Sequence, residues 1–121
     1  MAIRGIRGAT TAGANTAEAI VEATQELLAA IVRLNELDLA DVASAFWTTT
    51  PDLNAEWPAF AARQVGWGDV PQLNAHEMNV PGQLPLCVRV LLHVNTEKAQ
   101  TAVRHVFMRG ATVLRPEYAA E

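Results

Sequence analysis

The sequence predicts an α+β fold, in which a mixed β-sheet carries helices on one face. The expected elements run strand, helix, strand, short helix and then several strands, an order that favours such a sheet. Half of the 121 residues are hydrophobic, so one domain spanning residues 1–121 can bury a core. The stretch 86–94 is apolar on both of its faces, which is typical of a strand in the middle of a sheet.

The first two expected elements are a strand and a long helix. The strand covers Ile3–Thr10, and its glycines predict that another element approaches closely there. From Thr16 to about Leu34 the apolar residues recur at helical spacing, which predicts a helix covering one face of the sheet. Asn15 is the expected N-cap, and Glu18 completes a capping-box-like pair with it.

The middle of the chain predicts two further strands around a short helix. A turn or short helical piece at Asp38–Asp41 leads into a strand over Val42–Thr50. Pro58 suits the first turn of a helix that runs through Val65 and ends at Gly66. The stretch Gln72–Met78 is expected to be extended.

The last third reads as strands. The strand at 86–94 is followed by two strand-like pieces, Val103–Met108 and Ala111–Arg115, before Pro116 ends regular structure. Only two substantial helices are available to cover strands that are apolar on both faces. We therefore expect a sandwich of the ferredoxin-like kind whose outer sheet face is buried against other subunits.

Arg89 is the exception in the 86–94 strand, because a charge in the middle of a sheet is costly unless something meets it. Two explanations stay open. Arg89 could have a permanent carboxylate partner, for which Glu77 is the candidate, or it could face a cleft that receives an anionic ligand. Arg4 and Arg7 fall on opposite faces of the first strand, so at most one of them can share a site with Arg89.

Composition excludes several classes of function. The net charge of −4 argues against nucleic acid or an acidic membrane as partner. No stretch reaches the ~18 apolar residues of a membrane span, and residues 1–4 do not begin a signal peptide. Cys87 is the only cysteine, so no internal disulfide can form, which fits a cytoplasmic protein. Ser44 is the only serine, and neither residue is expected to act as a nucleophile.

Metal and nucleotide sites are not expected. His76, His93 and His105 lie far apart, and none stands in a metal-ligand pattern. The glycine-rich loops that cradle phosphates are absent from the sequence.

Several segments together resemble one known family. In chain order they are residues 3–11 (IRGIRGATT), 50–53 (TPDL), Pro58-Ala59 with Arg63, Glu77-Met78, 87–90 (CVRV), 104–106 (RHV) and 113–116 (VLRP). Their order and spacing are similar to those of the small monofunctional chorismate mutases of the Bacillus type, nearly end to end.

The resemblance implies a homotrimer in which the sheets pack as a pseudo-α/β-barrel, with active sites at the subunit interfaces. It also implies conversion of chorismate to prephenate in phenylalanine and tyrosine biosynthesis, without a cofactor. Carried over by position, the implied catalytic residues are Arg89, Glu77 and Arg7. The implied substrate-binding residues are Arg63, Arg115, Asn74, Phe107, Leu114, Trp57 and Ala59.

Three positions depart from the family pattern. Asn74 stands where cysteine is usual, and it can still hydrogen-bond a hydroxyl. Phe107 stands where tyrosine is usual, so a phenolic donor is lost, and Phe60 replaces a lysine near the mouth of the pocket.

The implied reaction explains both the arginines and the missing nucleophile. It breaks a C–O bond and forms a C–C bond within one molecule, so it needs a compact substrate conformer and stabilisation of negative charge on the ether oxygen. Two other readings use the same residues: a non-catalytic trimer that binds a small carboxylate as a sensor or regulator, and a structural trimer with arginine–glutamate interface pairs.

Overall fold

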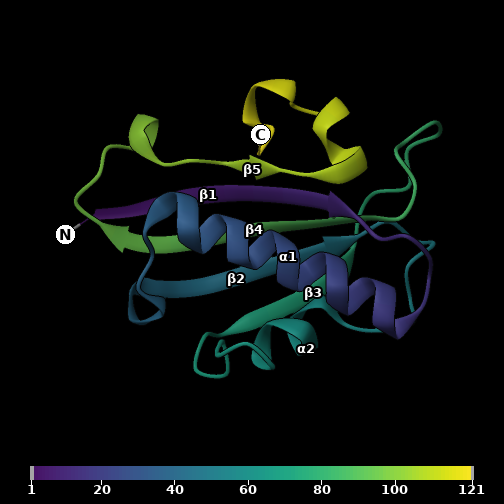
Figure 1. Ribbon diagram of the computed structural model, residues 1–121, viewed down its shortest axis with the longest axis horizontal. Helices are drawn as coiled ribbons and strands as arrows, with labels where there is room; N and C mark the ends of the chain where they lie inside the picture. Colours follow the sequence, from purple (N-terminus) through teal and green to yellow (C-terminus); the bar gives the residue numbers. More distant parts are fainter. Residues whose placement is uncertain (1, 121) are drawn as a thin grey trace.

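The computed structural model describes residues 2–120 and contains one mixed five-stranded sheet (Figure 1). The strands lie in the order β3-β2-β4-β1-β5. Strand β4 pairs antiparallel with β1 and β2, while β5 runs parallel to β1 and β3 runs parallel to β2. The bounds are Ala2–Thr11 for β1, Val42–Thr49 for β2, Gln72–His76 for β3, Cys87–Thr96 for β4 and Val106–Phe107 for β5.

Two α-helices accompany the sheet. Helix α1, Ala17–Asn35, lies across one face, and α2, Pro58–Arg63, lies beside β3 (Figure 1). Short 3-10 helices complete the described chain: η1 at Leu39–Asp41, η2 at Gln100–Ala102, η3 at Arg109–Val113 and η4 at Pro116–Tyr118. The expected mixed sheet with helices on one face is confirmed. The expected 1–121 domain includes two terminal residues that lie outside the described part of the chain.

Helix α1 forms the core against the sheet because its apolar residues recur every three or four positions. Ile20, Leu27 and Ile31 are fully buried on this stripe. The close approach predicted from the first-strand glycines occurs at Gly8, where an added Cβ would lie 2.7 Å from Ile31 Cδ1 and 3.1 Å from Val90 Cγ1. A glycine there lets the helix pack directly on β1.

The predicted N-cap of α1 is off by one residue. Thr16, not Asn15, is the N-cap, and its hydroxyl accepts a hydrogen bond from the Ala19 N–H at 3.1 Å. Glu18 is therefore one position too early to complete a capping box. Asn15 is engaged elsewhere, because its amide donates to Asn54 Oδ1 at 2.8 Å.

The prediction of strands at the C-terminal end is wrong in part. Of Val103–Met108 only Val106 and Phe107 form a strand, β5, although the Met108 N–H still donates to the Ala9 carbonyl of β1 at 2.9 Å. The stretch Ala111–Arg115 is not a strand, because most of it belongs to η3. Arg109 takes a left-handed conformation (φ 50°), which turns the chain out of the sheet immediately after β5.

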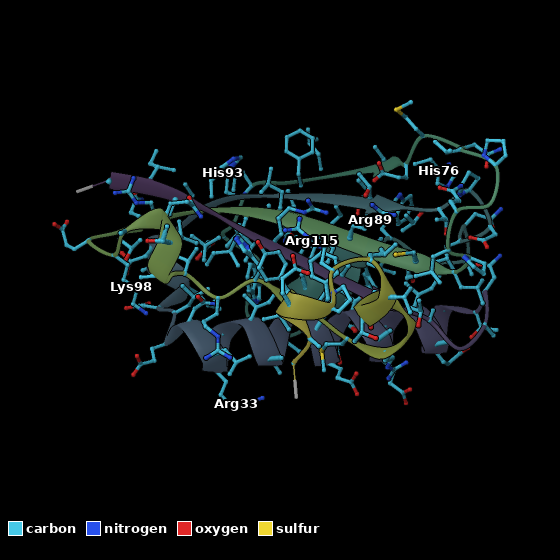
Figure 2. The ribbon with its side chains drawn as sticks, turned by 90° about the horizontal axis from the view of Figure 1, so that it is seen from above. Arg33, His76, Arg89, His93, Lys98 and Arg115 are labelled. Atoms are coloured by element: carbon cyan, nitrogen blue, oxygen red, sulfur yellow. The ribbon has the colours of Figure 1, made fainter. Side chains whose placement is uncertain are left out.

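The central strand β4 separates two chemically different faces. Val88, Val90 and Leu92 point towards α1 and are buried, while Arg89 and His93 belong to the opposite face. Figure 2 shows this division, with Arg33 of α1 on one side of the sheet and Arg89 and His93 on the other. We call these the helix face and the outer face.

The outer face is partly apolar and uncovered by helices. Ile3, Phe46 and Leu73 expose 60%, 46% and 59% of their surface there. Towards β5 this face is covered by the chain's own C-terminal segment, where Leu114 and Tyr118 pack against Ala9 and Phe107. No helix within residues 2–120 has the length and apolar character needed to cross a membrane.

Candidate active site

The sheet register gathers the three residues expected to be catalytic on the outer face. Arg89 pairs with Ala9 of β1 and with Thr48 of β2, so Arg7, two residues before Ala9, lies on the same face. Glu77 follows β3, and its backbone N–H donates to the Thr49 carbonyl at 2.7 Å. A cavity of about 440 Å³ opens here, lined by Arg7, Phe46, Thr48, Glu77, Arg89, Val90 and Leu91.

Arg89 has no permanent carboxylate partner in the described chain. Its Nε is buried and has no hydrogen-bond partner among residues 2–120. Glu77 instead accepts a hydrogen bond from the Thr48 hydroxyl at 2.6 Å, and no ion pair joins it to Arg89. The explanation of Arg89 as half of a structural ion pair with Glu77 is therefore wrong for this structure. A buried donor without a partner is costly, so its presence in a cavity indicates a place prepared for an acceptor.

Arg7 is positioned at the cavity by a hydrogen bond from its backbone N–H to His105 and by contact of its guanidinium with the Phe107 ring. Its N–H donates to Nδ1 of His105 at 2.9 Å, and its Cζ lies 5.7 Å from the centre of the Phe107 ring. Burial lowers the pKa of His105, and the positive charges of Arg7 and Arg115 lower it further. A neutral imidazole with a free Nδ1 lone pair is what the Arg7 N–H requires.

The C-terminal segment brings the remaining outer-face residues close to this cavity. Phe107 and Leu114 pack in one cluster with Cys87. Arg115 lies over the Tyr118 ring with its Cζ 4.5 Å from the ring centre, donates to the Tyr118 hydroxyl at 3.0 Å and pairs with Glu117 at 3.1 Å. Burial raises the pKa of the Cys87 thiol, which keeps the thiol uncharged and suits a packing role.

The other predicted binding residues lie elsewhere in the same chain. Asn74 accepts a hydrogen bond from the Ala59 N–H at 3.1 Å. A second cavity, of about 360 Å³, is lined by Trp57 and Asn74 together with Trp47 and other residues near the β2–β3 edge. Trp47 points to the helix face, so this cavity opens on the opposite side of the sheet from Arg89.

Arg63 belongs to this second group. It lies at the end of α2, is exposed, and has its Cζ 5.9 Å from the centre of the Phe60 ring. The structure therefore brings together Arg7, Glu77, Arg89, Phe107, Leu114 and Arg115 on one side. It leaves Trp57, Ala59, Arg63 and Asn74 together on the other side.

Three contributors were not found from the sequence. Thr48 orients Glu77, His105 holds the Arg7 backbone, and Tyr118 stacks under Arg115. Strand alternation could have placed Thr48 opposite Trp47, on the face of Arg89. The role of His105 depends on how β5 pairs with β1, and that of Tyr118 on how the chain folds back after β5, for which the sequence pattern carries no signal.

The site is suited to an anion rather than to a metal. Within residues 2–120 no group of three or more His, Cys, Asp or Glu side chains is placed to hold a metal ion. Arg7 and Arg89 supply positive charge and donors, Glu77 supplies an acceptor, and the surrounding apolar side chains reduce the effective dielectric. Fold and site together define a small α+β protein that presents arginines to an anionic ligand at an exposed sheet face.

Comparison with known proteins specifies the family. The model of chorismate mutase type I matches residues 3–118. The chain is 47% identical over 116 residues to the chorismate mutase AroH of Thermus thermophilus, covering 95% of each protein. It is 43% identical over 118 residues to chorismate mutase AroH of Bacillus subtilis, covering 97% of this chain and 93% of the relative.

A solved structure agrees. A chorismate mutase from Clostridium thermocellum superposes with a TM-score of 0.88 at 45% identity, covering 90% of this chain and 97% of that one. The chain belongs to the type I chorismate mutase family.

Proposed function

We propose that the protein is a chorismate mutase that acts as a cytoplasmic homotrimer. It rearranges chorismate to prephenate, a step towards phenylalanine and tyrosine, and it needs no cofactor. Family membership supports the reaction. The observation in this chain that carries the proposal is the buried, unpartnered Nε of Arg89 in a cavity shared with Arg7 and Glu77.

The reaction is an intramolecular exchange of bonds. The ether C–O bond of chorismate breaks while a C–C bond forms, and no proton, electron or group leaves the molecule. The protein therefore has to select a compact conformer of a flexible dianion and stabilise the negative charge that grows on the ether oxygen. Arg7 and Arg115 hold the carboxylates in that conformer.

Arg89 supplies the stabilisation that is stronger in the transition state than in the bound substrate. The ether oxygen is a weak acceptor at first and becomes partly anionic as its bond to carbon breaks, so a fixed guanidinium donor gains most at that moment. Glu77, oriented by Thr48, accepts from the ring hydroxyl and balances the added positive charge. Loss of the usual tyrosine hydroxyl at Phe107 places more of the binding on the arginines.

The way the predicted residues divide within one chain supports a site shared between subunits, and the family resemblance implies that the assembly is a trimer. The sheet stands between Arg89 on its outer face and Asn74, Trp57 and Arg63 on the other side. The two groups can line one site only if the second comes from a neighbouring subunit. The exposed apolar side chains of Phe46 and Leu73 on the outer face support burial against that neighbour.

The test is to add purified protein to chorismate and follow the loss of chorismate absorbance together with the appearance of prephenate. Catalytic conversion, at protein concentrations far below that of the substrate, supports the mutase. A carboxylate sensor would bind chorismate and raise the melting temperature without converting it. That result would reject the proposed activity. A purely structural trimer would show neither effect.

A further inference from the structure

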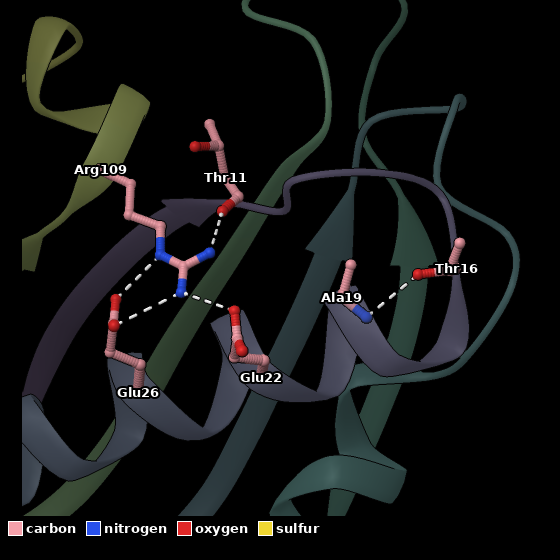
Figure 3. Close-up of polar contacts among 6 residues, drawn as sticks. All are labelled: Thr11, Thr16, Ala19, Glu22, Glu26 and Arg109. Atoms are coloured by element: carbon pink, nitrogen blue, oxygen red, sulfur yellow. Dashed lines mark hydrogen bonds and ion pairs between the residues drawn. The ribbon is translucent and has the colours of Figure 1, made fainter.

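The C-terminal segment that carries Leu114 and Arg115 over the outer face is bonded at its start to helix α1, on the helix face of the sheet. We call residues 109–118 the strap. Leu114 and Arg115 lie towards its end, over the outer face, whereas Arg109 begins it and reaches back to helix α1 (Figure 3). The strap thus crosses the β5 edge of the sheet from the helix face to the outer face.

Arg109 makes a branched set of contacts with helix α1 and with the end of β1. Its Nε donates to Glu26 Oε1 at 2.9 Å, and its Nη2 donates to Glu26 Oε2 at 3.4 Å and to Glu22 Oε1 at 3.3 Å. Its Nη1 donates to the Thr11 carbonyl at 3.4 Å. Two carboxylates and a strand terminus therefore hold one guanidinium, whose side chain is only 28% exposed.

The backbone at Arg109 has a conformation that glycine adopts more readily than other residues. Arg109 has φ 50°, a left-handed conformation that disfavours any side chain with a Cβ. The next residue, Gly110, donates its N–H to the Thr11 hydroxyl at 3.1 Å. The contacts of the arginine side chain offset the unfavourable backbone, so they fix both the position and the direction in which the strap leaves β5.

We propose that Arg109 is a positioning residue for the reaction: its contacts with Glu22 and Glu26 hold the strap where Leu114 and Arg115 close the candidate site. This inference rests on the proposed mutase activity. Arg109 touches no substrate, because its side chain lies against α1 and away from the cavity at Arg89. It acts by ordering in advance a segment that substrate binding would otherwise have to order.

The strongest test removes the two carboxylates, which lie far from the cavity. In Glu22→Gln/Glu26→Gln the strap is less ordered in the free enzyme, and the cost of ordering it falls on both the bound substrate and the transition state. We expect KM to rise about three- to tenfold while kcat changes less than about twofold. Exposed ion pairs contribute little to stability, so the melting temperature should barely move.

The matched control is Glu18→Gln/Glu36→Gln, which removes the same charge from exposed positions of the same helix region that do not contact Arg109. Arg109→Gly completes a double-mutant cycle, because glycine keeps the turn without the guanidinium. The glycine variant and the triple variant should each show the same rise in KM as the carboxylate pair, since all three remove one set of contacts.

The outcomes separate cleanly. The positioning role would be overturned if KM were unchanged in Glu22→Gln/Glu26→Gln, or if it rose equally in the control variant. It would also be overturned if the rise in KM of the triple variant were the product of the rises in the glycine variant and the carboxylate pair. A fall in kcat at constant KM would overturn it too, because that indicates fewer folded molecules rather than a displaced strap. A wild-type protein without turnover would reject the proposed function and this inference together, whereas active wild type with unchanged variants would reject the inference alone.

Discussion

Arg89 lowers stability in the free protein but is proposed to serve the reaction. The buried and unpartnered Nε of this half-buried arginine lowers the stability of the free protein. Its neighbour Glu77 could have removed that cost, but Thr48 holds its carboxylate instead. In the proposed reaction the missing acceptor is the ether oxygen of the substrate, which becomes anionic only as its bond to carbon breaks.

Substitution of Arg89 should therefore separate activity from stability. Arg89→Ala is expected to lower kcat by a factor of ~10² to 10³ or more, because a fixed donor to a developing oxyanion is lost. Arg89→Lys should also lose most activity, since one ammonium cannot copy the planar fork. Absorbance of chorismate measures turnover, and thermal unfolding measures stability.

The melting temperature of Arg89→Ala should stay within a few degrees of wild type, because the buried, unpartnered Nε is removed along with the side chain. If Arg89→Lys kept activity within a few-fold of wild type, the planar geometry of the guanidinium would not matter and its positive charge alone would account for the effect.

At the scale of elements, the helix–sheet contact depends on one small residue. Gly8 of β1 lies under α1 so closely that a Cβ would lie 2.7 Å from Ile31 Cδ1. Gly8→Ala is expected to lower the free energy of unfolding by ~1–3 kcal/mol through overpacking. Gly13→Ala is the control, since nothing lies within 4 Å of its added Cβ. Urea unfolding of both variants tests this, and equal stabilities would contradict it.

His105 links β1 to the start of β5 and should make stability depend on pH. Its pKa in the folded protein lies below the ordinary value of 6.5, because of burial and then of Arg7 and Arg115. As pH falls below about 6.5 the unfolded chain takes up a proton more readily than the folded one, so the free energy of unfolding falls. Above about pH 6.5 the neutral His105 makes its full contribution to the free energy of unfolding.

The measurement is urea unfolding between pH 7.5 and 5 at one protein concentration, for wild type and for His105→Asn. The asparagine retains an acceptor for the Arg7 N–H but does not titrate. The wild type should lose more stability than the variant over this range. Parallel curves would show that His105 is not responsible. Asp52 and Glu117, whose carboxyl pKa values are lowered, contribute to acid sensitivity only at lower pH.

The sequence predicted the regular elements well where periodicity is strong. The helix expected at 16–34 forms at Ala17–Asn35, and the strand expected at 86–94 forms at Cys87–Thr96. The prediction of a strand at Ala111–Arg115 was wrong, because the β-branched Thr112 and Val113 favour a strand locally but the chain forms η3 there. The left-handed turn at Arg109 and the contacts with Glu26 override that preference, and both depend on tertiary structure.

Strand alternation predicted that at most one of Arg4 and Arg7 can share a face with Arg89, and the register shows that Arg7 is that residue. No sequence pattern indicated that Glu77 would bond Thr48 rather than Arg89. That choice depends on how β3 aligns beside β2, which is a property of the folded sheet.

At the scale of the whole molecule, the residues proposed for the site divide between the two sides of one chain. One chain supplies Arg7, Glu77 and Arg89 on the outer face of its sheet, and carries Trp57, Arg63 and Asn74 on the far side. A closed trimer in which each outer face meets the neighbour's β3 edge would bring the two groups together three times. Light scattering should therefore give about three times the mass of the 13.1 kDa chain.

The measurement that tests this account most directly is complementation between two damaged subunits. Arg89→Ala and Arg63→Ala should each leave a folded protein with at least about tenfold lower turnover. After the two are unfolded, mixed in equal amounts and refolded, about a quarter of the sites should combine an intact outer face with an intact neighbour. Chorismate turnover should then recover to about a quarter of the wild-type rate. A mixture no more active than the average of the two variants would contradict the shared site.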